Sequence, residues 1–349
     1  MGLPNIVVEF LTKANTAITR SERGIVCLVI SDTTKESRIT EYKSISDVVE
    51  TDWSEENLKI IKETFLDGPS KVYVARVKTE ETLTNIEKDL DLIKINWITH
   101  VNNDQTEIVE YVKKRNLKGG SAAIKAVVFN QAANDTHIVN FTNVKVTRSD
   151  GAEVDGYKYL GRITGMLAAL PLDRSATYYT FPDLASVQEP EKPGEAVDAG
   201  EFVLFNDYGT VKAARGVNSA TTTEKEDLKK ITIIEGMDLM KEDIIETFKN
   251  QYVGKYKNNL DNQSVFVAAI NTYFRQLGMS GVLNPDFANL AAIDIEKQRN
   301  AWADAGTTEA LDWDDETVKK TPFKSYVYMR ANVQFSDAIE DLEFSVYMN

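Results

Sequence analysis

Along residues 24–180, short apolar runs take turns with stretches in which apolar side chains recur every three or four residues. This pattern predicts strands separated by helices. Residues 25–30 and 71–77 are short runs rich in apolar side chains, which is typical of strands buried on both faces. In 83–93 and 160–170, apolar side chains recur every three or four residues, which is typical of helices with one buried face. Short strands that alternate with helices favour a largely parallel α/β sheet.

Acidic residues mark two further predicted helix starts. Asp52 and Glu55 stand three residues apart, as do Asp104 and Glu107, and this is the spacing of a capping box. The apolar side chains that we expect on these two helices are Leu58, Ile61 and Phe65, and Ile108, Tyr111 and Val112. Further strands are predicted over 95–101, 124–129 and 137–141.

The second half of the chain follows a different pattern. Residues 182–200 hold three prolines and two glycines among acidic residues, so they are predicted to be a linker or a long loop. Residues 201–214 then read as a hairpin, and 244–252 and 266–277 have helical spacing. We therefore expect an α+β segment to follow the α/β part.

Both ends of the chain carry the alternation that is typical of a strand. The alternate apolar positions are Ile6, Val8 and Phe10 at one end, and Leu342, Phe344 and Val346 at the other. A longer alternating stretch over 323–335 precedes the second set. Such terminal strands either add to the exposed sheet edge of a neighbouring subunit or close a sheet within their own chain. The pattern alone leaves both alternatives open.

Composition narrows the class of protein. The chain has 349 residues, enough for two or three domains, and 42% of them are apolar, so disorder throughout is not expected. Its 54 acidic and 40 basic residues give a formal charge of −14, which disfavours binding to nucleic acid and to anionic membranes. No apolar run is long enough to span a bilayer, and the first residues lack a basic, then apolar, export signal. We expect the protein to start in the cytoplasm.

No catalytic, cofactor-binding or metal site is predicted. The sequence has no glycine-rich phosphate loop, no Gly-x-Ser-x-Gly elbow and no metal-ligand spacing of histidines or cysteines. Its one cysteine, Cys27, lies in an apolar run and is predicted to be a buried small side chain. The acidic cluster over 312–316 lacks the glycine of a calcium loop and is predicted to begin a helix.

One enzymatic alternative stays open on the residues alone. It is a cytoplasmic, hydrolase-like α/β enzyme in which His100 or His137, the only two histidines, acts with a carboxylate. His100 stands at the end of a predicted strand, where α/β sheets often bind ligands. Against this, no serine in a tight glycine-flanked turn accompanies either histidine.

Several stretches, taken in order and spacing, carry a resemblance to a known family. They are GLPNI at 2–6, SERGI at 21–25, IVNFT at 138–142, GRITGMLAA at 161–169, PLDRSATY at 171–178, ARGVNS at 214–219 and DAIEDLE at 337–343. With them the chain resembles contractile tail sheath proteins. It resembles the short type found in Gram-positive myophages, PBSX-like elements and R-type bacteriocins such as diffocins.

The resemblance implies an α/β domain of subtilisin-like topology without protease activity, followed by an α+β C-terminal domain and flanked by strand-forming arms. Carried over to this chain, the parts are an arm over 1–20, a sheath domain over 21–205, a C-terminal domain over 206–335 and an arm over 336–349. The arms would add strands to neighbouring C-terminal domains. The donor residues would then be Ile6, Val8, Phe10, Leu342, Phe344 and Val346.

The resemblance also implies what the protein does and with what. Subunits would stack as hexameric rings around an inner tube, and contraction would drive the tube through a target cell envelope, with no cofactor. The implied partners are further copies of the chain, the tube protein, and baseplate and tail terminator proteins. Assembly would take place in the bacterial host cytoplasm before the particle is released. A tube or baseplate protein is the alternative assembly module, but tubes are mainly β, unlike the predicted α/β part.

Overall fold

The computed structural model describes residues 17–78, 81–120, 122–223 and 225–348. The chain divides into two compact units. The sheet unit combines Ser21–Glu242 with Asp337–Asn349, and the helical unit combines Met1–Arg20 with Asp243–Ser336. Helices and strands occur in both, so the predicted mixed α/β class is confirmed.

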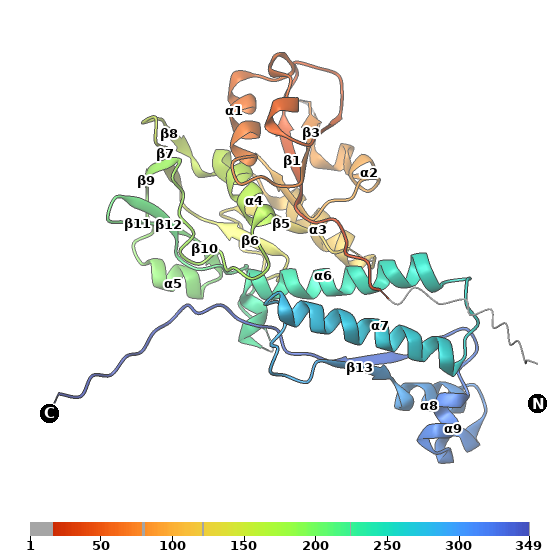
Figure 1. Cartoon of the computed structure of the whole chain (residues 1–349). Coiled ribbons are helices and arrows are strands. Elements are labelled where there is room, and N and C mark those ends of the chain that lie inside the picture. The colour runs from red at the N-terminus through yellow and green to blue at the C-terminus, as the bar shows by residue number, and fades with distance from the viewer. Residues whose placement is uncertain (1–16, 79–80, 121, 224, 349) are drawn as a thin grey trace, which may run out of the picture. The chain divides into compact units, whose positions relative to one another are not determined.

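A seven-stranded sheet forms the centre of the sheet unit (Figure 1). Its order is β10-β6-β5-β4-β1-β3-β2, and every pair is parallel except the antiparallel edge pair of β2 and β3. The strands are β1 (Ile25–Ser31), β2 (Ile39–Tyr42), β3 (Lys71–Val77), β4 (Trp97–His100), β5 (Lys125–Phe129), β6 (Ile138–Phe141) and β10 (Glu201–Phe202). The predicted strands over 25–30, 71–77, 95–101, 124–129 and 137–141 are confirmed within two residues at each end.

Two pairs of helices bury the two faces of this sheet. The first pair is α1 (Glu55–Thr64) with α4 (Leu160–Ala169), and the second is α2 (Glu87–Leu90) with α3 (Thr106–Leu117). Successive side chains of a strand point to opposite faces. Accordingly, Leu28 of β1 lies in the core with the first pair and Val29 in the core with the second. This explains why the run at 25–30 is apolar throughout.

A close approach of α1 and α4 depends on a glycine. A Cβ atom added to Gly165 would lie 2.0 Å from the backbone oxygen of Thr64, a separation that no real side chain tolerates. The stretch GRITG, which carries part of the resemblance, is therefore a packing motif at this helix pair.

Smaller β-structures complete the sheet unit. They are an antiparallel sheet of β7 (Lys145–Arg148), β8 (Glu153–Asp155) and β9 (Leu184–Val187), a hairpin of β11 (Leu204–Asp207) and β12 (Thr210–Ala213), and the short helix α5 (Pro193–Asp198). The prediction of a linker or a long loop over 182–200 is wrong where β9 and α5 form, and Leu184 and Val187 of β9 are buried core residues. The predicted hairpin is confirmed, but its first strand starts later because Glu201–Phe202 pairs with β6.

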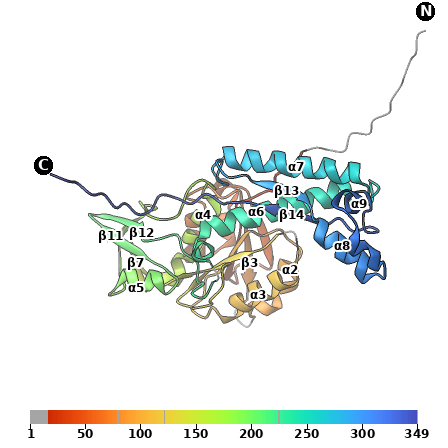
Figure 2. The same cartoon turned by 90° about the horizontal axis from the view of Figure 1, so that it is seen from below.

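The helical unit is built on two long helices. The boundary between the units falls inside α6 (Ile231–Thr247), which continues as a π-helical turn, η6 (Phe248–Tyr252), before α7 (Leu260–Met279). An antiparallel pair, β13 (Leu290–Ile293) and β14 (Met329–Asn332), lies along α7 (Figure 2). The remaining helices are α8 (Ile295–Asp304) and α9 (Asp315–Lys320). Short 3₁₀ turns in the two units are η1 (Ile45–Asp47), η2 (Glu50–Asp52), η3 (Leu83–Asn85), η4 (Gly156–Tyr159), η5 (Glu226–Lys229) and η7 (Thr308–Asp312).

The helix starts differ from the sequence prediction. Ser54 rather than Asp52 caps α1, and its hydroxyl accepts the N–H of Asn57 at 3.4 Å. Asp104 binds the N–H of Thr106 at 3.0 Å but stands one residue before the N-cap of α3. The helix predicted over 83–93 is broken into a 3₁₀ turn and the single turn of α2. Several residues near a helix start can accept hydrogen bonds from its free backbone N–H groups, and the local backbone geometry decides which of them does so.

The long strand predicted over 323–335 is also mostly wrong. Only Met329–Asn332 forms a strand, with one further bridge between Phe335 and Leu283. Lys324 has a φ of +50°, a left-handed turn conformation that no strand continues through. Tyr326 packs against the Phe323 ring at 5.9 Å instead of alternating across a sheet.

Candidate subunit-exchange site

The C-terminal tail, residues 337–348, is extended but forms no strand (Figure 1). The side chains of Leu342, Phe344 and Val346 are 88%, 79% and 70% exposed. The expectation of a strand here is therefore not met in the single chain, where no described strand pairs with the tail. The other predicted exchange residues, Ile6, Val8 and Phe10, lie outside the described residues.

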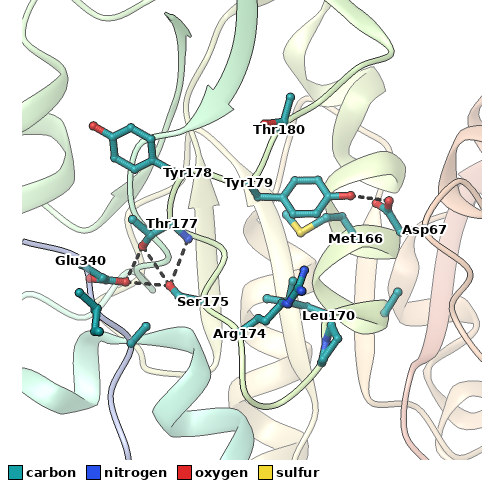
Figure 3. A pocket seen from close by; sticks show the side chains of 14 residues that line it. Asp67, Met166, Leu170, Arg174, Ser175, Thr177, Tyr178, Tyr179, Thr180 and Glu340 are labelled. Atoms are coloured by element: carbon teal, nitrogen blue, oxygen red, sulfur yellow. Dashed lines mark hydrogen bonds between the residues drawn. The ribbon is translucent and has the colours of Figure 1, made fainter.

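The base of the tail is anchored through one carboxylate (Figure 3). Glu340 Oε1 accepts hydrogen bonds from Ser175 Oγ at 2.8 Å and from Thr177 Oγ1 at 2.6 Å. Its second oxygen lies 3.3 Å from Arg215 Nη1. The Glu340 side chain is only 8% exposed, so this carboxylate is held in a nearly closed polar setting. Hydrogen bonds to a buried carboxylate are among the stronger ones in proteins.

Two further acidic residues of the tail are paired with bases of the sheet unit. Lys230 forms an ion pair with Asp337, and Arg215 forms one with Asp341. The Arg215 hydrogen bond lowers the pKa of the Asp341 carboxyl. These exposed pairs are individually weak, but together with Glu340 they fix residues 337–341 at three points. The apolar segment 342–348 therefore begins from a defined position.

The anchor draws together stretches that are far apart in the sequence. Ser175 and Thr177 belong to 171–178, Arg215 belongs to 214–219, and Glu340 belongs to 337–343. These are three of the stretches that carry the family resemblance. The sequence alone did not identify these residues as a site. The one indication was that all of them lie in stretches that carry the family resemblance.

A pocket of about 740 Å³ lies beside the anchor (Figure 3). Ser175, Thr177 and Glu340 line one part of it, and Tyr179 and Asp67 line another. Tyr179 donates a hydrogen bond to Asp67, which also pairs with the buried Arg162 of α4.

Arg162 ties this region to the core. Its side chain is 2% exposed, and its guanidinium bonds to Asp67 and, at 3.2 Å, to Asp183 Oδ1. Tyr159 donates to the other oxygen of Asp183 at 2.5 Å. A buried charge of this kind needs its partners, so the cluster is a structural one.

A second buried cluster joins the start of α6 to the large sheet. Lys125 Nζ lies 3.1 Å from Glu235 Oε1 and 2.9 Å from Asp238 Oδ2. Burial by itself would lower the pKa of Lys125, but the two carboxylates raise it above its usual range. His137 completes the cluster, with Nε2 3.2 Å from Asp238 Oδ1 and Nδ1 3.7 Å from Asp135.

His137 is accordingly held as a cation. Burial would lower its pKa, but Asp135 and Asp238 outweigh burial and raise it to about 9. An imidazolium fixed between two carboxylates cannot act as a general base at neutral pH. The structure thus assigns His137 to an ion cluster.

His100 lies at the end of β4, as the sequence predicted, but it is buried. Burial lowers its pKa, and its Nδ1 has no hydrogen-bond partner among the described residues. No described serine or cysteine is hydrogen-bonded to its ring.

Cys27 and the acidic cluster at 312–316 are the remaining candidates for chemistry, and both have structural roles. Cys27 is fully buried, and burial raises the pKa of its thiol to about 12. In the acidic cluster at 312–316, Asp314 caps α9 by accepting the N–H of Thr317 at 2.7 Å. The described residues contain no group of three or more His, Cys, Asp or Glu side chains that could hold a metal. None of the described helices is long and apolar enough to cross a membrane.

Comparisons with known sequences agree with the resemblance. Residues 223–349 match the phage tail sheath C-terminal domain family. A curated tail sheath protein from the Clostridium phage phiCD119 is 29% identical over 365 residues, which cover 99% of each chain.

Solved structures share the fold at low sequence identity. The sheath of the anti-feeding prophage in its contracted state matches with a TM-score of 0.72 at 12% identity, over 100% of both chains. The sheath of the PVC extracellular contractile injection system, also contracted, gives 0.72 at 11% identity over 99% and 98%. A sheath tail protein from Desulfitobacterium hafniense gives 0.69 at 13% identity, over 83% of this chain and 94% of the other.

Together these comparisons confirm the resemblance to contractile tail sheath proteins, and with it a structural, non-enzymatic role. The enzymatic alternative at His100 or His137 is therefore dropped. The relatives are parts of phages and of extracellular injection particles.

Proposed function

We propose that this chain is the repeating subunit of a contractile sheath, in which copies stack as hexameric rings around an inner tube. Contraction of the sheath would drive the tube through the envelope of a target cell. The curated relative of nearly equal length, itself named a tail sheath protein, supports this role. The baseplate of the anti-feeding prophage also contains a chain of this fold, with a TM-score of 0.69, which supports a baseplate as a partner.

The observation that carries the proposal is the unpaired tail. Seven residues, 342–348, expose an apolar face with strand periodicity, while residues 337–341 are fixed on the sheet unit. A large exposed apolar segment on a protein surface marks an interaction site. An extended segment with this alternation is suited to adding a strand to another sheet.

The helical unit offers a sheet that is incomplete by itself. Its β13–β14 pair has only two strands, and two-stranded sheets are marginal in water without further strands or packing. We propose that the arms of neighbouring copies complete it. Leu342, Phe344 and Val346 would be donors from one neighbour, and Ile6, Val8 and Phe10 from another.

The same proposal includes the sheet topology, the bounds of the working parts and the remaining partners. The uninterrupted parallel run β3-β1-β4-β5-β6-β10 supports the subtilisin-like topology that the resemblance implies. The proposed working parts are the arms over 1–20 and 336–349 and the domains over 21–205 and 206–335. They need not coincide with the compact units, because parts that move during contraction are not defined by compactness in one chain. The inner tube and tail terminator proteins, and assembly in the host cytoplasm, are further parts of the proposal.

Negative-stain electron microscopy of the purified full chain tests this function. We expect hollow cylinders of uniform width from the wild-type chain. Two deletions serve as matched variants: residues 1–11, and residues 342–349, which leaves the Glu340 anchor in place. Both should remain folded by circular dichroism yet stay monomeric. Cylinders of wild-type length from either deletion would contradict strand exchange. A wild-type chain that stays monomeric, even with purified tube protein as a template, would contradict the sheath role.

A further inference from the structure

The helical unit contains a pocket of about 470 Å³. Its lining residues come from two stretches, 248–266 and 324–329, which both belong to this unit. Pockets that bind small molecules typically have volumes of about 300–1,000 Å³. The pocket is therefore large enough for a small organic molecule.

Four aromatic rings form one side of this pocket, and we call them the aromatic wall. They belong to Phe248, Tyr252, Tyr256 and Phe266. The centroid of the Tyr252 ring lies 4.5 Å from that of Phe266 and 5.5 Å from that of Tyr256. Because aromatic rings prefer offset or edge-to-face contacts with further rings, the wall favours a flat aromatic ligand.

The backbone is irregular in both stretches that line the pocket. Phe248–Tyr252 forms the π-helical turn η6, and Lys324 has a φ of +50°. π-helical turns occur frequently at functional sites, and residues held in the left-handed region cluster at ligand-binding positions. Two segments of unfavourable backbone conformation thus border one pocket.

A buried acceptor that lacks a donor also lines the pocket. Gln263 is 3% exposed, and its Oε1 has no hydrogen-bond partner among the described residues. Its Nε2 donates to Asn258 Oδ1 at 2.7 Å, and Asn258 Nδ2 donates to the backbone oxygens of Lys324 and Tyr326 at 3.0 and 2.8 Å. Since these bonds fix the orientation of both amides, Oε1 of Gln263 is the atom left unpaired. A ligand N–H or O–H would supply the donor that this buried oxygen lacks.

Two cations line the same pocket. Lys257 and Lys324 are exposed, and neither forms an ion pair within the part of the chain that the structure describes. The described lining residues include no acidic side chain, although the whole chain has a formal charge of −14. Two unpaired lysines without a neighbouring acid favour an anionic group on the ligand.

We propose that this pocket is a binding site for a small aromatic acid. The ring of the ligand lies against the aromatic wall, and its N–H or O–H group donates to Gln263 Oε1. The anionic group lies beside Lys257 and Lys324. This inference goes beyond the sheath role and does not depend on it, because a single chain supplies all the residues of the site.

Indole-3-acetate is a probe that combines a flat ring system, one ring N–H and one carboxylate. Its binding to the full-length chain is measured by saturation-transfer NMR titration at neutral pH and low salt. Two analogues each lack one feature, since 1-methylindole-3-acetate has no N–H donor and indole-3-acetamide has no charge. We expect each analogue to bind about tenfold more weakly, because each loses one charge-assisted contact or one bond to a buried acceptor.

Two variants assign these contacts to residues. Gln263→Met keeps the length of the side chain but removes the acceptor, so it should bind indole-3-acetate and the N-methyl analogue equally. Lys257→Gln should weaken the binding of indole-3-acetate several-fold and leave that of the uncharged amide unchanged. Lys43→Gln removes the same charge from an exposed position of the sheet unit and should bind all three ligands as the wild type does.

The absence of saturable binding of indole-3-acetate would overturn the inference. Equal affinity of the wild-type chain for all three ligands would do the same. So would wild-type affinity in both Gln263→Met and Lys257→Gln, because the ligand would then bind elsewhere. If circular dichroism shows that Gln263→Met is unfolded, the three ligands on the wild-type chain and on Lys257→Gln decide. None of these results bears on the sheath role, which the formation of cylinders tests separately.

Discussion

Thr177 Oγ1 lies 2.6 Å from Glu340 Oε1, which joins the loop after α4 to the base of the C-terminal tail. The contact spans 163 residues of sequence, and Ser175 shares the same carboxylate oxygen. The tail therefore leaves the sheet unit from a fixed point, although the residues beyond this point are exposed.

Glu340→Ala should release the tail without unfolding the sheet unit. The variant loses two hydroxyl hydrogen bonds and one Arg215 contact, so we expect the free energy of unfolding to fall by about 1–2 kcal/mol. Amide hydrogen exchange over 337–341 should accelerate. Glu191→Ala removes the same charge from an exposed position and is the control, with a change within about 0.5 kcal/mol. Equal exchange rates in the two variants would show that Glu340 does not anchor the tail.

Gly165→Ala should destabilise the sheet unit strongly. A Cβ at this position would lie 2.0 Å from the Thr64 backbone oxygen, so α1 and α4 would have to move apart. Overpacking of this kind costs about 1–3 kcal/mol or more, which urea denaturation would detect. Gly194→Ala, where a Cβ meets no atom within 4 Å, is the matched control. A Gly165→Ala chain as stable as wild type would mean that the helix pair adjusts freely.

Arg162→Met should lower the free energy of unfolding, because the core contains a buried cation that its carboxylate partners require. The side chain keeps a similar length but leaves Asp67 and Asp183 without their shared partner. Breaking a buried pair from one side costs about 3–5 kcal/mol, and the partial exposure of both aspartates places the expected loss near the lower end. Chemical denaturation measures it. Adding Asp183→Asn should recover part of the loss, and the absence of any recovery would argue against coupling between these residues.

Stability should fall at alkaline pH because of His137. Its pKa is raised from 6.5 to about 9 by Asp135 and Asp238, against the opposing effect of burial. A raised folded-state pKa stabilises the fold fully below the unfolded value near 6.5, and this contribution is lost as the pH rises through about 9. We expect a decrease on the order of 3 kcal/mol across this window, measured by urea denaturation at fixed ionic strength. His137→Gln should show a flatter profile there, and a wild-type profile as flat as that of the variant would refute the charged state.

The strands of the large sheet were predictable because each one is a short apolar run with few alternatives. Helix boundaries were harder to predict. Asp52, Ser54 and Glu55 all favour a helix start, and only the folded loop places Ser54 at the N-cap. The strand predicted over 323–335 was wrong for a different reason. The sequence does alternate there, but the chain turns at Lys324. The aromatic side chains then pack around Phe323 instead of extending along a sheet.

The candidate site was predictable only in part. The apolar alternation of Leu342, Phe344 and Val346 marked the tail, and the structure describes these side chains as exposed. Glu340, Ser175 and Arg215 form the anchor through contacts between distant segments, which no local pattern encodes.

If the tail adds a strand to a neighbouring copy, its fixed base limits how far the two copies can move apart. From Asp341, seven residues extended as a strand reach about 23 Å, at roughly 3.3 Å per residue. If the tail stays paired with its acceptor, that acceptor must remain inside this radius before, during and after any rearrangement. Large changes of sheath length would therefore have to arise from rotation of the subunits about short tethers.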